Sequence, residues 1–525
     1  MKRILIALTW GILPSLFCFP VRGLNQSLSE VGIEATKLHQ APYNLKGRKI
    51  AIGQVEIGRP MQFGLDKLPP FHRRLPLRGL FFRDTLVMPN QYVDSHAFMV
   101  ASVMVSNEKG FSGVAPLANL YSGAIGFLQR NAQPEECLTS QHIALQNNGD
   151  VRAINLSFGE SLLRDDRPLP LLDGNALFTQ CLDWSARVHN VLYVVAGNQG
   201  KGGISIPTDH YNGITTAYST TVNGVFRKVD FANLSVSTDD VDKSLIRNEI
   251  NVGGRGAISL LAPGNNIRAY NTEGELQNIQ GSSFAAPHIT GAVALLQEGG
   301  DRTYAKNIDN WSLDYRRQEV MKAILLNSAE KIEDYGNGDF LGMSRTVLTQ
   351  KNRTWLQTNA YRNPAIPLSM EMGTGHLNVY RAYQQLMAGQ WKPQESVDIM
   401  GWNYDTLSVN NYHRYQLKKP LREGSFVSIT LTWNRLVELT DNNNNQIYDI
   451  GERFIDQGLN NLDLYLVSKD NQIICSSVSQ VDSVEHIFCP IPKTAEYHIK
   501  VRFQNQVNQP NQNYALAWHT VAQEN

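Results

Sequence analysis

The chain has 525 residues, more than one compact core usually holds, so we expect two domains. Lysines and arginines total 48, as do aspartates and glutamates, and the formal net charge is zero. Binding to nucleic acid or to a membrane surface normally shows as a basic excess, so we expect neither kind of partner.

The N-terminus has the order of a secretory signal peptide. Lys2 and Arg3 precede an apolar run, and small residues at Val21 and Gly23 allow cleavage after Gly23. We therefore predict a signal peptide over residues 1–23 and secretion, extracellular or periplasmic. A membrane anchor is the alternative, but the run is short for a span and Pro14 interrupts it. No other segment is apolar enough to cross a bilayer, so we expect no membrane span in the mature chain.

Export to an oxidising compartment favours disulfides. Removal of the signal leaves an even number of cysteines, Cys137, Cys181, Cys475 and Cys489. Pairing within each domain gives Cys137–Cys181 and Cys475–Cys489. Four buried thiols are the alternative.

Short, nearly continuous apolar runs alternate with helical patterns after the signal. The runs are KIAIGQV, ANLYSGAIG, VRAINLSF, VLYVVAG and AISLLAP, and the helical patterns include HAFMVASVMV, FTQCLDWSARVH and residues 284–297. Such runs are typical of strands buried on both faces of a parallel sheet. The alternation predicts a doubly wound α/β domain with a mostly parallel sheet over residues 24–392.

The pattern changes near residue 392. WKPQES is typical of a linker, and the segments beyond it alternate polar and apolar residues without helical periodicity. They include FVSITLTW, LDLYLVSKD, YHIKVRF and YALAWHT. This alternation predicts a smaller, all-β sandwich domain over residues 396–525.

Ser283 is the candidate nucleophile, in the segment GSSFAAPHITGAVALL. Gly281 permits a tight turn, and Pro287 fits the first helical turn without losing a needed hydrogen bond. The pattern places Ser283 at the N-terminal end of a buried helix, where free N–H groups favour a developing anion. A serine needs a base to remove its proton, and His96, at the start of another apolar helical pattern, is the candidate.

Several segments together resemble one known family. GSSFAAPHITGAVALL resembles the nucleophile motif of the subtilase (subtilisin-like) family, and SHAFMVA its histidine motif. GVAPLANLY, INLSFG, VVAGNQG and LLAPG resemble further family segments, in the family's order. The resemblance implies a subtilisin-like fold and a triad in the chain order acid, histidine, serine.

The acid position departs from the family. The resemblance places an Asp at the end of the first strand, two residues before a Gly, and here KIAIGQVEIG has Glu56 there, with Gly58 in register. Glutamate carries the same carboxylate on one more methylene, so it can accept the Nδ1–H of His96 if the strand end accommodates the reach. Asp94 is the nearest alternative, but at a helix start two residues from His96 it would point elsewhere.

The resemblance also implies an oxyanion donor and substrate-binding walls. Asn198 matches the family's oxyanion residue, whose amide would act with the backbone N–H of Ser283. Ser157, Phe158 and Gly159 would pair with an extended peptide, and Val195, Ala196 and Gly197 would form the facing wall. Glu160 follows where the family commonly has Gly; it either favours basic substrate residues or is solvated surface.

DNNNNQIYDIGE spaces oxygen ligands like an EF-hand loop. The candidate Ca²⁺ ligands are Asp441, Asn443, Asn445, Asp449 and Glu452, with the carbonyl of Ile447. Gln446 stands where the sharp turn prefers Gly, and no flanking helices are evident. The loop predicts a structural Ca²⁺ site, with a solvated Asn-rich loop as the alternative.

We therefore expect a secreted serine endopeptidase that acts on protein or peptide substrates through an acyl-enzyme on Ser283, with no cofactor for catalysis. A pseudopeptidase that binds peptides or a surface partner without turnover is the alternative, because Glu56 and the neighbours of His96 depart from the family. A third interpretation, a sugar- or surface-binding protein, does not account for the Ser, His and Asn positions.

Overall fold

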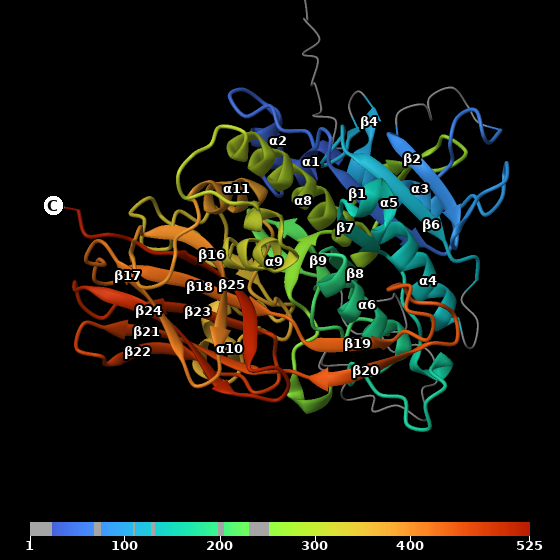
Figure 1. The fold of residues 1–525 in the computed structure, drawn as a ribbon. Helices are drawn as coiled ribbons and strands as arrows, with labels where there is room; N and C mark the ends of the chain where they lie inside the picture. Colours follow the sequence, from blue (N-terminus) through green and yellow to red (C-terminus); the bar gives the residue numbers. More distant parts are fainter. Residues whose placement is uncertain are drawn as a thin grey trace, which may run out of the picture.

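The computed structural model describes residues 24–67, 75–108, 111–127, 132–197, 204–229 and 251–524 (Figure 1). The predicted signal peptide and Asn198 lie outside these residues. No helix within the described ranges is long and apolar enough to span a bilayer.

A large, mostly parallel sheet organises the N-terminal part of the described chain. In spatial order its strands are β14 (Val347–Leu348), β10 (Val225–Lys228), β9 (Ile214–Val222), β8 (Leu192–Ala196), β7 (Val151–Leu156), β1 (Ala51–Glu56), β6 (Asn119–Ala124), β2 (Leu77–Phe82) and β3 (Thr85–Leu86), and β11 (Leu260–Pro263) pairs with β9. The central pairs β6–β1, β1–β7, β7–β8 and β8–β9 are parallel, and antiparallel pairing occurs at β9–β10 and β2–β3.

Helices cover both faces of this sheet. Along β8, Val194 belongs to a core shared with α3 (Ser95–Val105), α8 (Ser282–Tyr304), α9 (Gln318–Asn327) and α11 (Val379–Met387). Its neighbour Val195 belongs to a second core, shared with α4 (Gln133–Ala144) and α6 (Leu177–Val188). Strands buried on both sides explain the continuous apolar runs in the sequence. The predicted doubly wound α/β fold is confirmed.

Shorter elements fill the connections of this region. They are α1 (Leu24–Leu28), α2 (Ala35–His39), β4 (Asn107–Glu108), β5 (Phe111–Ser112), α5 (Gln146–Gly149), β12 (Ile267–Tyr270), β13 (Leu276–Ile279) and α10 (Asn359–Arg362).

Two stacked sheets form the C-terminal region. One has the order β15 (Ser396–Val397), β17 (Tyr412–Leu417), β24 (Tyr497–Asn505), β21 (Asn461–Ser468) and β22 (Ile473–Ser477); the other has β16 (Met400–Ser408), β25 (Asn511–His519), β18 (Phe426–Trp433) and β23 (Val484–Pro490). All pairs are antiparallel except β15–β17. Alternate residues of both sheets share one core, so the predicted sandwich is confirmed.

The two regions pack closely together. The Asn327 side chain at the end of α9 accepts hydrogen bonds from Ser428 and Thr430 of β18, both at 3.0 Å. A hairpin of β19 (Leu436–Thr440) and β20 (Arg453–Gly458) leaves the sandwich and lies along α6 (Figure 1). The division near residue 392 stays a prediction.

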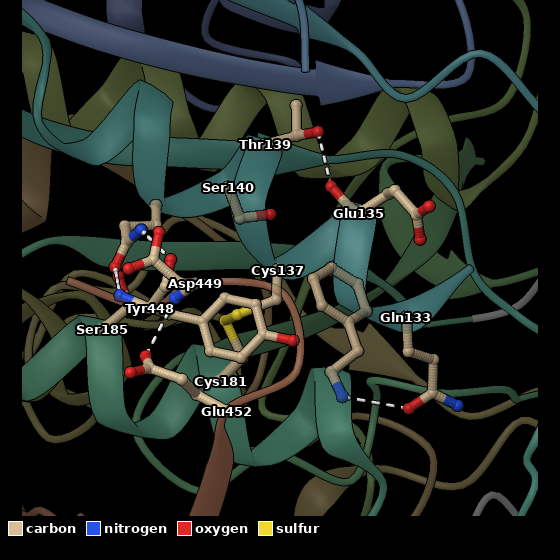
Figure 2. Close-up of a disulfide and its surroundings, with 12 residues drawn as sticks. Gln133, Glu135, Cys137, Thr139, Ser140, Cys181, Ser185, Tyr448, Asp449 and Glu452 are labelled. Carbon is tan, nitrogen blue, oxygen red and sulfur yellow. Dashed lines mark hydrogen bonds between the residues drawn. A yellow bond between two sulfur atoms is a disulfide. The ribbon is translucent and has the colours of Figure 1, made fainter. Parts of the chain in front are cut away.

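Both predicted disulfides are present. Cys137–Cys181 joins α4 to α6, and the Tyr448 ring from the hairpin loop lies beside it (Figure 2). Cys475–Cys489 joins β22 to β23, one strand from each sheet of the sandwich. The alternative of four free thiols is wrong.

Candidate active site

Glu56 and His96 meet at the carboxyl end of β1. Glu56 is the last residue of a fully buried strand, and its side chain is 2% exposed. Its Oε2 lies 3.3 Å from Nδ1 of His96, whose side chain is 39% exposed. The additional methylene of glutamate therefore does not prevent contact between the carboxylate and the ring.

The start of α3 fixes where His96 stands. Asp94 is the N-cap, and its carboxylate accepts the backbone N–H of Ala97 at 2.8 Å. The Gln54 amide of β1 donates to the Ala97 carbonyl at 2.9 Å, which ties the strand to the helix. A Cβ on Gly58 would lie 2.3 Å from that of Asp94, so this approach requires glycine. Asp94 is thus engaged by its own helix, while Glu56 contacts the His96 ring.

The surroundings of His96 favour its protonated form. Burial lowers its pKa, but the charge of Glu56, the hydrogen bond to Glu56 and the charge of Asp94 together outweigh burial, so the pKa of His96 lies above its ordinary value. A base with a raised pKa binds a proton more strongly, which suits a group that removes one from a hydroxyl.

Ser283 stands in the first turn of α8. Gly281 precedes the helix with φ 139°, a conformation open to glycine almost alone. The next residue after the serine, Phe284, lies against the His96 ring, with ring centroids 5.5 Å apart. The Ser283 hydroxyl donates to the Ser157 carbonyl at 3.2 Å. The chain thereby brings the start of α3 and the start of α8 to the carboxyl end of β1, a central strand of the sheet.

Pro287 creates a second link between Ser157 and Ser283. In an α-helix the Ser283 carbonyl would accept the N–H of residue 287, and proline has none. The Ser157 hydroxyl donates to that carbonyl instead, at 2.8 Å, and itself accepts from Asn155 at 2.8 Å. The expectation that Pro287 lies in the first turn without losing a needed hydrogen bond is therefore wrong, because Pro287 lies inside α8 and leaves the Ser283 carbonyl without its helical donor. The hydrogen bond from Ser157 was not predicted; the proline four residues after Ser283 was the available signal.

The remaining predicted wall residues are mostly buried. Phe158 is 3% exposed and stacks on Phe178 with centroids 5.9 Å apart, whereas Gly159 is half-buried. Val195 and Ala196 are fully buried in β8, so their side chains belong to the core. A Cβ on Gly197 would lie 2.9 Å from the backbone carbonyl oxygen of Thr216, which explains glycine there. The side chains of Phe158, Val195 and Ala196 are therefore part of the core, and the predicted substrate-binding walls stay a prediction.

Glu160 is fully buried, and the expectation of a solvated surface carboxylate is wrong. Its carboxyl group neighbours that of Glu136, from α4. Burial raises the pKa of Glu136 well above its ordinary value, and the charge of Glu160 adds to the rise; burial also raises the pKa of Glu160. The Glu136–Glu160 pair therefore retains a proton at a pH at which an exposed carboxyl group is ionised. Nothing local in the sequence pairs these two residues.

The candidate Ca²⁺ loop joins β19 to β20 and closes on itself. Asp441 accepts the N–H of Gln446 at 2.7 Å, and the amides of Asn443 and Asn445 both reach Asp449 at 2.7 Å. Gln446 adopts φ 63°, the left-handed turn for which an EF-hand uses glycine. The oxygen-rich donor set suits a hard cation, but among the described residues no three His, Cys, Asp or Glu side chains gather as a metal site. The Ca²⁺ site stays a prediction.

The family model of the subtilase family matches residues 86–354, just over half of the chain. The chain belongs to the subtilase family. The matched residues include His96 and Ser283 and begin after Glu56, so the acid position rests on the geometry of β1 alone.

The curated relatives of this subtilase are proteases, and their sequence identity to this chain is low. A thermostable alkaline protease of Halalkalibacterium halodurans is 24% identical over 39% of this chain and 47% of its own length. Subtilisin NAT of Bacillus subtilis subsp. natto is 26% identical over 50% of this chain and 59% of its own length. Subtilisin Savinase of Lederbergia lenta is 26% identical, with coverage of 39% and 64%. The chain therefore spans about half to two thirds of the length of these relatives.

Two solved protease structures are partly similar to the structure of this subtilase. The prenylagaramide maturation protease PagA has a TM-score of 0.42 at 18% identity, covering 70% of this chain and 99% of that one. A serine-to-alanine mutant of the PatA protease domain has a TM-score of 0.42 at 20% identity, covering 65% and 97%.

Proposed function

We propose that this subtilase is a secreted serine endopeptidase that hydrolyses peptide bonds through Glu56, His96 and Ser283. The observation that carries the proposal is the 3.3 Å contact between Glu56 Oε2 and His96 Nδ1, beside the first turn of α8. Membership of the subtilase family and the protease names of its relatives support the same reaction class.

The reaction follows from these groups. Glu56 holds the proton of His96 on Nδ1, which leaves Nε2 free to accept the hydroxyl proton of Ser283. The serine oxygen attacks the peptide carbonyl, the C–N bond breaks, and the protonated His96 gives its proton to the leaving amine. Water then attacks the acyl-enzyme while His96 accepts one of its protons; the bond from the acyl carbon to the Ser283 oxygen breaks, His96 returns the proton to that oxygen, and the carboxylic acid is released. Asn198 is the proposed oxyanion donor, from outside the described residues.

A fluorophosphonate probe with a casein cleavage assay tests this proposal. We expect the purified mature protein to be labelled and to cleave casein, and Ser283→Ala, which keeps the fold but lacks the nucleophile, to do neither. Wild-type protein that is neither labelled nor active beyond Ser283→Ala would reject the peptidase and favour a peptide-binding role.

Secretion and Ca²⁺ binding are separate parts of the proposal. Two disulfides support an oxidising compartment. N-terminal sequencing of exported protein should begin at Leu24, and intracellular protein retaining Met1 would oppose export. The loop from Asp441 to Glu452 would hold Ca²⁺ as a structural ion without any part in the chemistry.

A further inference from the structure

The segment that precedes the first strand is built into the catalytic region. Its residues Leu28, Ile33, Ala35 and Leu38 are all fully buried in the core that also holds α8. The Ile33 carbonyl accepts the N–H of Val379 at the start of α11, at 2.8 Å. Residues 24–39, containing α1 and α2, are therefore part of the same packed layer as the helix that carries Ser283 (Figure 1).

One polar contact links this segment directly to α8. His288, five residues after Ser283, is fully buried. Its Nδ1 lies 2.7 Å from the Phe284 carbonyl, and its Nε2 lies 2.8 Å from the Ser27 hydroxyl. Ser27 itself is 8% exposed.

The direction of the two hydrogen bonds follows from the chemistry. A carbonyl can only accept, so Nδ1 of His288 carries the hydrogen. Burial lowers the pKa of His288 to about 4, so the ring is neutral at neutral pH and Nε2 is an acceptor. Ser27 must therefore donate. Only a side chain with a donor proton at this position satisfies the ring.

The His288 ring contacts the first turn of α8. Pro287 leaves the Ser283 carbonyl to Ser157, and the His288 ring holds the next carbonyl, that of Phe284. Phe284 in turn packs against His96. Two hydroxyl groups from outside the helix thus hold two consecutive carbonyls of its first turn: Ser157 binds that of Ser283 directly, and Ser27 binds that of Phe284 through the His288 ring.

We infer that Ser27 is a positioning residue, whose donation to Nε2 of His288 holds the first turn of α8 so that Ser283 faces His96. The inference rests on the proposed function. It assigns a catalytic consequence to a segment that lies outside the family match and far from Ser283 in sequence.

Ser27→Ala, Ser27→Thr and Ser29→Ala form a matched set of variants. Alanine removes the donor; threonine keeps it, and a cavity of about 90 Å³ beside Ser27 gives room for the added methyl group. Ser29 lies in the same segment, and its hydroxyl donates only locally, to the Gln26 carbonyl at 2.9 Å, so Ser29→Ala is the control.

Turnover should separate positioning from mere stability. With a peptide substrate, we expect Ser27→Ala to lower kcat about tenfold, the equivalent of one hydrogen bond, and to leave KM within about twofold. Ser27→Thr should restore kcat, and Ser29→Ala should leave it unchanged. Active sites, counted by fluorophosphonate labelling, should remain as numerous in Ser27→Ala as in wild type. The acid limb of the pH profile should keep its midpoint, because Glu56 and not Ser27 sets the charge near His96.

Three results would overturn the inference. They are wild-type kcat in Ser27→Ala, no recovery with threonine, or a loss of activity that matches a loss of titratable active sites. The last would mean that Ser27 only stabilises the fold. An unlabelled, inactive wild-type protein would instead reject the proposed peptidase itself, and with it a catalytic role for Ser27.

Discussion

At the residue scale, the unusual feature is a glutamate in contact with His96, the proposed base. A neutral amide at this position would remove both the charge that raises the His96 pKa and the carboxylate that accepts its Nδ1–H. A histidine base works only when neutral, so the proposed activity should fall as the pH drops through the His96 pKa, which lies above the ordinary histidine value.

Glu56→Gln tests that arrangement. We expect kcat to fall by at least about 100-fold, because the ring loses the group that orients it. The residual acid limb should move to lower pH, because a neutral partner no longer raises the His96 pKa. A pH–rate profile measures both effects. Unchanged kcat in Glu56→Gln would mean that another group orients His96, with Asp94→Asn as the next variant to examine.

The Ser157 hydroxyl donates to the Ser283 carbonyl, which lacks its helical donor because residue 287 is proline. This arrangement gives a second prediction. Ser157→Ala should lower the free energy of unfolding by about 1–3 kcal/mol, because the Ser283 carbonyl loses its donor. Pro287→Ala supplies a backbone N–H in the helix, so the same serine change should cost less in that background. Urea unfolding of the four proteins in this cycle measures the coupling. If Ser157→Ala lowered the free energy of unfolding equally in both backgrounds, the Ser157 hydroxyl would not be replacing the missing N–H of Pro287.

How far sequence reasoning reaches differs from residue to residue. Glu56, His96 and Ser283 could be predicted because each stands at the end of a strand or the start of a helix, where pattern and motif coincide. Ser27 and Glu136 could not, because each meets its partner only through the packing of distant segments. Glu160 shows the same limit. The sequence places it directly after the predicted substrate-binding segment, but its burial depends on packing against α4, which the sequence does not reveal.

At the element scale, the β19–β20 hairpin and its loop stand out. Polar side chains of the loop converge on Asp449, while Tyr448 is fully buried and its backbone N–H and C=O both bond the Gln141 side chain of α4. The strand alternation predicted the sandwich but not that one hairpin would leave it, because the hairpin's partner is a helix about 300 residues earlier.

Calcium should stabilise this loop if the donor set binds it. We expect Ca²⁺ to raise the Tm and EGTA to lower it. At a free Ca²⁺ concentration 100 times the Kd, the free energy of unfolding should rise by about 2.7 kcal/mol. Asp449→Asn should abolish the response. Asp470→Asn, an exposed acid in a turn of the sandwich, is the control and should retain it. A Tm that is indifferent to Ca²⁺ in wild-type protein would identify the segment as a self-contained Asn-rich loop.

At the scale of the whole molecule, a buried cation joins the two regions. The Arg435 side chain is 3% exposed and lies 3.3 Å from Asp183 of α6 and 2.8 Å from Asp456 of β20. It also donates to the Gly174 carbonyl at 2.7 Å. Removing one partner of such a buried pair leaves the other charge without compensation.

Arg435→Met should therefore lower the free energy of unfolding by about 3–5 kcal/mol. Adding Asp183→Asn should recover part of the loss, since no buried charge then remains unpaired there. Arg453→Met, at an exposed arginine of the same hairpin, should have little effect. Denaturant unfolding measures all three, and a loss in Arg453→Met equal to that in Arg435→Met would show that charge on the hairpin, not burial, sets the effect.

The placement of Tyr448 and Val437 bears on how such chains can diverge. Both belong to the core that contains Phe158 and the Cys137–Cys181 bridge, so the sandwich supplies side chains to the layer behind the proposed substrate strand. Recombination that replaced the sandwich with an unrelated domain would leave that layer open. We therefore expect changes at Tyr448 to be accompanied, over evolution, by changes on α4 and α6, as in an obligate pair and not in exchangeable modules.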